Sequence, residues 1–324
     1  MFSPFILNIV SEFLLPNSST PTGALSHISR GSPIEKQFTF NGFTYAAQLW
    51  GDKSGLPVIA LHGWLDNSGS FSALAPQLEG VQCLAIDSAG HGLSDHKLGL
   101  DDYPLWSDTA AIYAIADEMG WDTFALMGHS RGAMIALLTA GTYPKRISHL
   151  IMIDAIIPPL TESESAIARI QDSITEIKYR IQRQATLFSS RQDAITARCA
   201  SRFAPVSETT AEQLAVRGLS ELEGKYSWHS DSKLWSLSGV GLSQDTLQAF
   251  VCSIVNAQIP SLLLLGAQGL VKQAPDEFVA QCDALAKQLA ARVDVFDDGH
   301  FLHTEKAASD VRKVIHGFLF SAHH

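Results

Sequence analysis

Short apolar runs alternate with longer stretches of helical periodicity from residue 57 onward. The runs are bounded by turn residues and cover 58–61, 82–86, 124–127, 149–153, 261–265 and 293–296. Apolar runs of this length, separated by helical stretches, are typical of buried parallel strands that are connected by helices. The pattern therefore predicts an α/β fold with a mostly parallel sheet and helices on both of its faces.

Two segments depart from this alternation. Residues 37–50 alternate in polarity around Asn41-Gly42, which predicts a β-hairpin at the start of the core. Residues 158–245 are polar and helix-prone, and the strand-like pattern resumes after them. An insertion explains that resumption better than a tandem domain does. We therefore expect a core of residues 34–157 and 246–324 and an inserted helical cap over 158–245.

The first 33 residues are expected to form an N-terminal helix and a linker. Residues 1–16 are apolar with helical spacing, but Glu12 interrupts the run and no basic residue precedes Arg30. A secretory signal carries early positive charge and a membrane span needs about 20 apolar residues, so we expect neither. Residues 17–32 are rich in Ser, Thr, Pro and Gly, as linkers are.

Composition narrows the range of partners. A chain of 324 residues with 46% hydrophobic residues can bury a sizeable core. The net charge of −10 and the lack of a Lys/Arg cluster exclude nucleic acid as a favoured partner. The four cysteines form no C-x-x-C pair, which suggests neither a zinc site nor a redox motif and fits a reducing cytoplasm. We expect no metal and no cofactor.

The strongest local motif is Gly128-His-Ser130-Arg-Gly132, between an apolar run and a helix-like segment. A strand-to-helix turn this sharp strains its central serine, and side chains two residues to either side would collide across it. The motif therefore predicts Ser130 as a nucleophile. Serine hydrolysis also needs two backbone N–H groups that face the developing oxyanion. We expect them from Arg131 and, in the loop after run 58–61, from Trp64.

The general base is expected C-terminal to Ser130. In proteins with such a nucleophile turn, the catalytic residues follow one another along the chain in the order serine, acid, histidine. His300 lies on the loop after run 293–296 and is favoured over His303, which we expect to be a partly exposed residue at the start of the last helix. His62 and Asp66 are interpreted as residues that order their loop. Residues 87–94 are interpreted as a structural turn, because their two glycines fit a sharp exit from the preceding strand.

Taken together, these motifs resemble the α/β-hydrolase superfamily. Within it, the segments His62-Gly-Trp-Leu-Asp-Asn67, Asp87-x-x-Gly-His-Gly-Leu-Ser94 and Gly128-His-Ser130 are similar to the serine hydrolase-like family. The resemblance covers most of residues 40–155 and 258–320 and little of the cap. It implies an α/β-hydrolase fold and the roles of serine and histidine given above.

The position of the catalytic acid differs from the pattern of that superfamily. The superfamily usually places it shortly after the strand that corresponds to run 261–265, where this chain reads Gly266-Ala-Gln-Gly269. We favour Asp154, which follows the strand after the nucleophile helix, because ligands bind at the carboxyl ends of strands in such sheets. Asp276 and the absence of a working acid remain alternatives.

We therefore expect a carboxylesterase that cleaves a small-molecule ester through an acyl-enzyme. A C–C bond hydrolase or a cofactor-free perhydrolase with the same triad remains an alternative, as does a non-catalytic binding protein. Trp228 and Trp235 are aromatic candidates for the substrate site. The sequence leaves the substrate and the oligomeric state open.

Overall fold

A computed structural model describes residues 31–158, 160, 165–201, 204–236 and 241–321. The predicted N-terminal helix and nearly all of the linker fall outside these residues. Among the residues described, no helix combines the length and the apolar character that crossing a membrane requires.

The centre of the molecule is an eight-stranded sheet in the order β1-β2-β4-β3-β5-β6-β9-β10. β2 pairs antiparallel with β1 and with β4, whereas the other neighbours pair in parallel. The strands are β1 (Ile34–Phe40), β2 (Phe43–Trp50), β3 (Leu56–Leu61), β4 (Val81–Ile86), β5 (Phe124–His129), β6 (Ile147–Ile153), β9 (Ser261–Gly266) and β10 (Arg292–Phe296). The six apolar runs are the six strands β3, β4, β5, β6, β9 and β10, which confirms that prediction.

The hairpin prediction is also confirmed. Phe40 pairs with Phe43 across the turn, and Asn41 and Gly42 both have positive φ angles, of 51° and 80°. A two-residue turn with two positive φ angles matches the twist of the strands, and asparagine and glycine adopt it at low cost. This turn fixes the register of the antiparallel edge.

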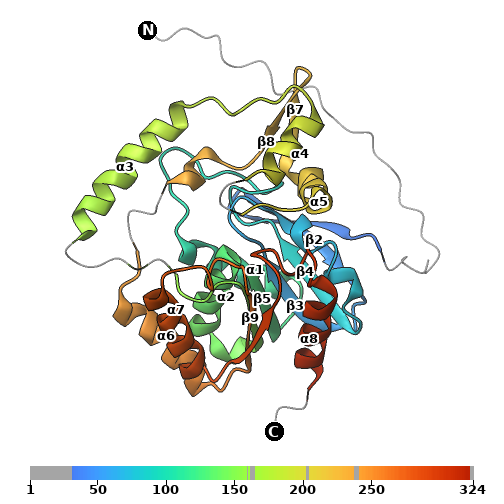
Figure 1. Cartoon of the computed structure of the whole chain (residues 1–324), viewed down its shortest axis with the longest axis vertical. Helices are drawn as coiled ribbons and strands as arrows, with labels where there is room; N and C mark the ends of the chain where they lie inside the picture. Colours follow the sequence, from blue (N-terminus) through green and yellow to red (C-terminus); the bar gives the residue numbers. More distant parts are fainter. Residues whose placement is uncertain (1–30, 159, 161–164, 202–203, 237–240, 322–324) are drawn as a thin grey trace.

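Helices cover both faces of the sheet, as predicted. On β3, Ile59 and Leu61 join one core and Val58 and Ala60 the other, because side chains alternate across a strand. The first core is closed by α1 (Thr109–Glu118), α2 (Arg131–Thr142), α6 (Gln244–Asn256) and α7 (Asp276–Gln288). The second is closed by α8 (Ala308–Phe320) and the short helices η1 (Ser68–Phe71) and η2 (Ala75–Gln77). Figure 1 shows α6 and α7 on one side of the sheet and α8 on the other.

The segment between β6 and α6 gathers at one end of the molecule (Figure 1). Its elements are α3 (Ala166–Gln182), α4 (Arg191–Cys199), α5 (Glu208–Gly218), β7 (Leu219–Leu222), β8 (Lys225–Trp228) and η6 (Ser232–Trp235). We expected helices alone, yet β7 and β8 form a hairpin around Glu223 and Gly224, both with positive φ. The division into core and cap stays a prediction, and we use "cap segment" below for residues 158–245.

Candidate active site

The carboxyl ends of neighbouring parallel strands bring the predicted site residues to one edge of the sheet. Strands β3, β5 and β6 are adjacent and lead into the loops of Trp64, Ser130 and Asp154. β9 and β10 continue the same edge, and the loop after β10 carries His300. Residues far apart in sequence therefore meet where open α/β sheets bind ligands.

Ser130 lies at the sharp turn between β5 and α2. Its φ of 52° and ψ of −119° are a conformation that L-residues with side chains rarely adopt. A Cβ atom on Gly128 would collide with the backbone of Gly132, and one on Gly132 with the carbonyl of Leu61. The two glycines thus permit the turn, as the motif predicted, and the Ser130 side chain remains partly exposed.

His300 and Asp154 contact each other directly. Nδ1 of His300 lies 2.6 Å from Oδ2 of Asp154, and the Asp154 residue is only 1% exposed. An ionised carboxylate only accepts hydrogen bonds, so the contact places the imidazole proton on Nδ1. Nε2 then keeps its lone pair, which is the form that a general base needs.

Asp154 is held by backbone donors as well. The N–H of Gly266 donates to Oδ1 at 3.1 Å, and the N–H of Leu270 donates to Oδ2 at 2.8 Å. A Cβ atom on Gly269 would overlap the Asp154 carboxylate. Asp154 therefore fills the space beside residues 266–269, the loop where the superfamily usually has its acid and this chain has none. The alternative, Asp276, is exposed in the first turn of α7.

The expected oxyanion donors lie at the ends of the adjacent strands β3 and β5. Arg131 is the first residue of α2, and the first N–H groups of a helix have no acceptor within it. Trp64 follows β3, and its indole N–H donates to the carbonyl of Leu234 in the cap segment at 2.9 Å. The catalytic use of both N–H groups stays a prediction.

His62 and the turn of residues 87–94 have the structural roles that we inferred. Nδ1–H of His62 donates to the Gly63 carbonyl at 2.7 Å, and its Nε2 accepts from the Ser88 N–H at 3.0 Å. Burial lowers the pKa of His62, which keeps the ring neutral. Asp87 accepts from backbone N–H groups on both sides, those of Ser68 and Leu93.

His303 is not the partly exposed helix residue that we expected. It is fully buried, and α8 begins only at Ala308. Its ring lies 4.3 Å from that of His129 and 5.5 Å from that of Phe71, measured between centroids. Burial lowers its pKa to about 3. The expectation was wrong because the loop before α8 folds inward, and helical periodicity cannot show that.

Sequence reasoning missed His129, which lies inside the serine motif. Its Nε2–H donates to the His300 carbonyl at 3.0 Å, and the two rings lie 4.6 Å apart. His129 thus ties the end of β5 to the loop of the expected base. Its place beside Ser130 was the only signal available.

A cavity of about 260 Å³ borders the His300 loop. It lies between that loop and the start of α5, and its lining includes Val206, Ser207, Gly299, His300 and Glu305. No group of three or more metal-ligating side chains occurs among the residues that the structure describes.

Comparisons with known proteins match this arrangement. Residues 57–307, which carry all of the loops above, match the family model described as alpha/beta hydrolase fold. A serine hydrolase-like protein of Danio rerio is 28% identical over 273 residues, 82% of each chain. A crystal structure of a hypothetical protein from Pseudomonas aeruginosa PAO1 has a TM-score of 0.82 at 34% identity, over 89% of this chain and 99% of that one. A thioesterase domain from the curacin biosynthetic pathway shares the fold, with a TM-score of 0.75 at 22% identity over 90% and 100% of the chains.

Proposed function

Because the chain belongs to the α/β-hydrolase fold family, we propose that it is a serine hydrolase that cleaves carboxylic esters through an acyl-enzyme on Ser130. Hydrolase activity is what the family and the serine hydrolase-like relatives support. The ester substrate and the triad are the proposal. The supporting observation is a strained, partly exposed Ser130 at the same sheet edge as a buried His300–Asp154 pair.

In the first half of the reaction, Ser130 Oγ attacks the carbonyl carbon of the ester while His300 Nε2 takes the hydroxyl proton. The C=O electron pair moves to the oxygen, and the N–H groups of Trp64 and Arg131 bind the oxyanion. Asp154 stabilises the imidazolium that forms. Collapse of the tetrahedral intermediate breaks the ester C–O bond, and His300 returns its proton to the alcohol that leaves.

In the second half, water replaces the alcohol. His300 takes one proton from the water as the oxygen attacks the acyl carbon, and the same two N–H groups bind the new oxyanion. When the bond to Ser130 breaks, the proton returns to Oγ and the carboxylic acid leaves. The net reaction is ester plus water to acid plus alcohol, so no oxidant or metal is required.

One of the two tryptophan candidates, Trp235, supports a substrate with an apolar group next to residues 62–67, which we call the oxyanion loop. Trp235 is 51% exposed, and its ring lies edge-on to that of Trp64 with centroids 4.6 Å apart. Trp228 instead packs among α4, α5 and Phe301, so we assign no substrate contact to it. A cytoplasmic location is part of the proposal and rests on the four cysteines, none of which forms a disulfide.

The test is covalent labelling with a fluorophosphonate, followed by a panel of p-nitrophenyl esters of increasing acyl length. We expect wild-type protein to be labelled at Ser130 and Ser130→Ala to be unlabelled, with kcat reduced at least about 10³-fold. The melting temperature of the variant serves as the folding control. A Ser130→Ala variant that keeps more than about a tenth of wild-type kcat would refute the proposed nucleophile.

A further inference from the structure

The loop after β3 is bonded to the cap segment at three points. Three of its four residues after Gly63 contribute a side chain, and each reaches a different cap element. The contacts are Trp64 Nε1–H to the Leu234 carbonyl in η6, Arg198 of α4 to Asp66, and Asn67 Nδ2–H to the Leu214 carbonyl in α5, at 2.9, 3.0 and 2.9 Å. The loop that we expect to bind the oxyanion is therefore held from the cap side.

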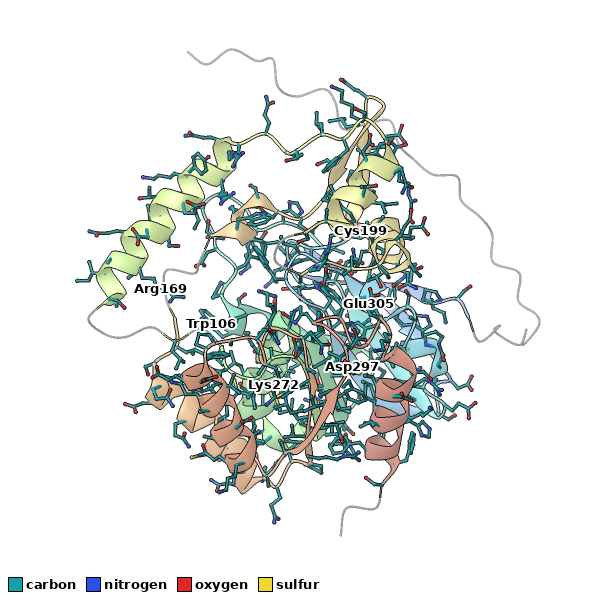
Figure 2. All side chains as sticks on the ribbon, in the orientation of Figure 1. Trp106, Arg169, Cys199, Lys272, Asp297 and Glu305 are labelled. Atoms are coloured by element: carbon teal, nitrogen blue, oxygen red, sulfur yellow. The ribbon has the colours of Figure 1, made fainter. Side chains whose placement is uncertain are left out.

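Of the three contacts, the one made by Arg198 is the charged one. The Arg198 side chain also contacts Ala204 and Phe301. One terminal nitrogen donates to Asp66 Oδ1, and the other donates to the Ala204 carbonyl at 2.9 Å. The guanidinium carbon lies 5.2 Å from the ring centroid of Phe301, the residue after His300. Figure 2 shows the end of α4, marked by the neighbouring Cys199, above the loop that carries Glu305. The Arg198 side chain thus contacts both the oxyanion loop and the loop that carries His300.

Asp66 links Arg198 to the backbone of the oxyanion loop. It is 1% exposed, and among the described residues Arg198 is the cation that pairs with it. Its second oxygen, Oδ2, packs against Gly63, and the N–H of Asp66 donates to the Gly63 carbonyl at 3.3 Å. A buried carboxylate that loses its cation must move or take up solvent. Such a movement would shift Gly63 and the neighbouring Trp64 N–H.

We propose that Arg198 is a positioning residue that fixes the oxyanion loop relative to the His300 loop, so that a docked α4 is required for turnover. This inference rests on the proposed function. Oxyanion donors act only within about 2.7–3.1 Å of the charge that they stabilise, and loss of one donor costs about 10²–10³ in kcat. A displaced loop therefore lowers kcat more than it raises KM.

We expect Arg198→Gln to lower kcat about 10- to 100-fold, with KM changed less than about threefold. Arg198→Lys should recover part of the loss, because a point charge still pairs with Asp66 but does not stack on Phe301 as a planar guanidinium does. The affinity for a trifluoromethyl ketone, which mimics the tetrahedral oxyanion, should fall in parallel with kcat. A purely structural role would change the amount of active enzyme and leave that affinity unchanged.

The experiment measures kcat per active site, with sites counted by fluorophosphonate titration, for Arg198→Gln, Asp66→Asn and the double variant. If Arg198 acts through Asp66, the double variant is no worse than the more damaging single variant. Arg191→Gln is the matched control, because Arg191 is an exposed arginine on the same helix and should leave kcat unchanged.

The outcomes separate the two proposals. If the wild-type protein is labelled and Arg198→Gln has the wild-type kcat per active site, the positioning role is overturned and the proposed function stands. Additive losses from Arg198→Gln and Asp66→Asn would also overturn it. A wild-type protein that is neither labelled nor able to hydrolyse any ester would overturn the proposed function and this inference with it. If Arg198→Gln does not fold, the ketone affinity of Arg198→Lys gives the same decision.

Discussion

Asp154 lies where a side chain at position 269 would have to go. The carboxylate overlaps the place of a Gly269 Cβ and accepts from the N–H groups of Gly266 and Leu270. The proposed acid therefore comes from the end of the neighbouring strand β6 and not from the loop after β9. The φ of Asp154, 48°, is unusual for a residue with a side chain, and the two N–H groups together with His300 hold the side chain in place.

At this scale we predict that Asp154→Asn lowers kcat by up to about 10⁴, with little change in folding. An asparagine amide retains the size of the carboxylate but favours the wrong imidazole tautomer, so that Nε2 of His300 carries the proton. The measurement is kcat on the best p-nitrophenyl ester together with the melting temperature.

Asp276→Asn is the matched control for this prediction, because Asp276 is exposed at the start of α7. It should retain wild-type kcat. The assignment of the acid would have to change if Asp276→Asn were the inactive variant, or if Asp154→Asn kept most of its activity.

Helix α5 is anchored to the core by a buried charge. Arg217, near its C-terminus, is 3% exposed and donates through Nε and a terminal nitrogen to Oδ2 of Asp87, at 3.1 and 2.7 Å. Its other terminal nitrogen pairs with Glu35 of β1. The helix therefore rests on the turn after β4 and on the edge hairpin at once.

We predict that Arg217→Met destabilises the protein by about 3 kcal/mol, because it leaves the fully buried Asp87 carboxylate without its cation. Urea unfolding at pH 7.5 measures the change. Lys313→Met is the control, since the Lys313–Asp310 pair is exposed on both sides and its loss should have little effect. Equal losses in the two variants would show that Arg217 is not an anchor.

Across the whole molecule, neutral histidines are buried beneath the edge that carries the site. His62 packs against His91 with ring centroids 4.9 Å apart, and His129 packs against His303. Burial lowers the pKa of all four, that of His303 to about 3. Each folded pKa lies below the unfolded value of about 6.5, so the unfolded chain binds more protons. Stability is therefore fully present above about pH 6.5 and is lost as the pH falls below it.

We predict that the loss of stability at low pH can be assigned to individual buried histidines. Between pH 7.5 and 5.0, His303 alone should contribute about 2 kcal/mol of destabilisation, at about 1.4 kcal/mol per pH unit below its unfolded pKa. His303→Leu should remove that share, so the drop in unfolding free energy between the two pH values becomes smaller than in wild type. Urea unfolding at both pH values measures it, and an unchanged drop would show that His303 is protonated in the folded protein.

The sequence by itself determined the local features of this protein. Burial of a strand requires an apolar run, and a hairpin turn with positive φ selects Asn-Gly, so the six parallel strands and the β1–β2 turn could be predicted. The glycines around Ser130 are likewise a local requirement of the strained turn. Each of these features depends on residues within a few positions of one another.

Only the tertiary structure decided which distant groups meet. The contact between His300 and Asp154 joins residues 146 positions apart, and it depends on the adjacency of β6, β9 and β10 in the sheet. The same holds for Arg198 on Asp66 and for the inward fold of His303, which helical periodicity misplaced. Periodicity records whether a position is buried and on which face, whereas strand order and loop packing determine its neighbour.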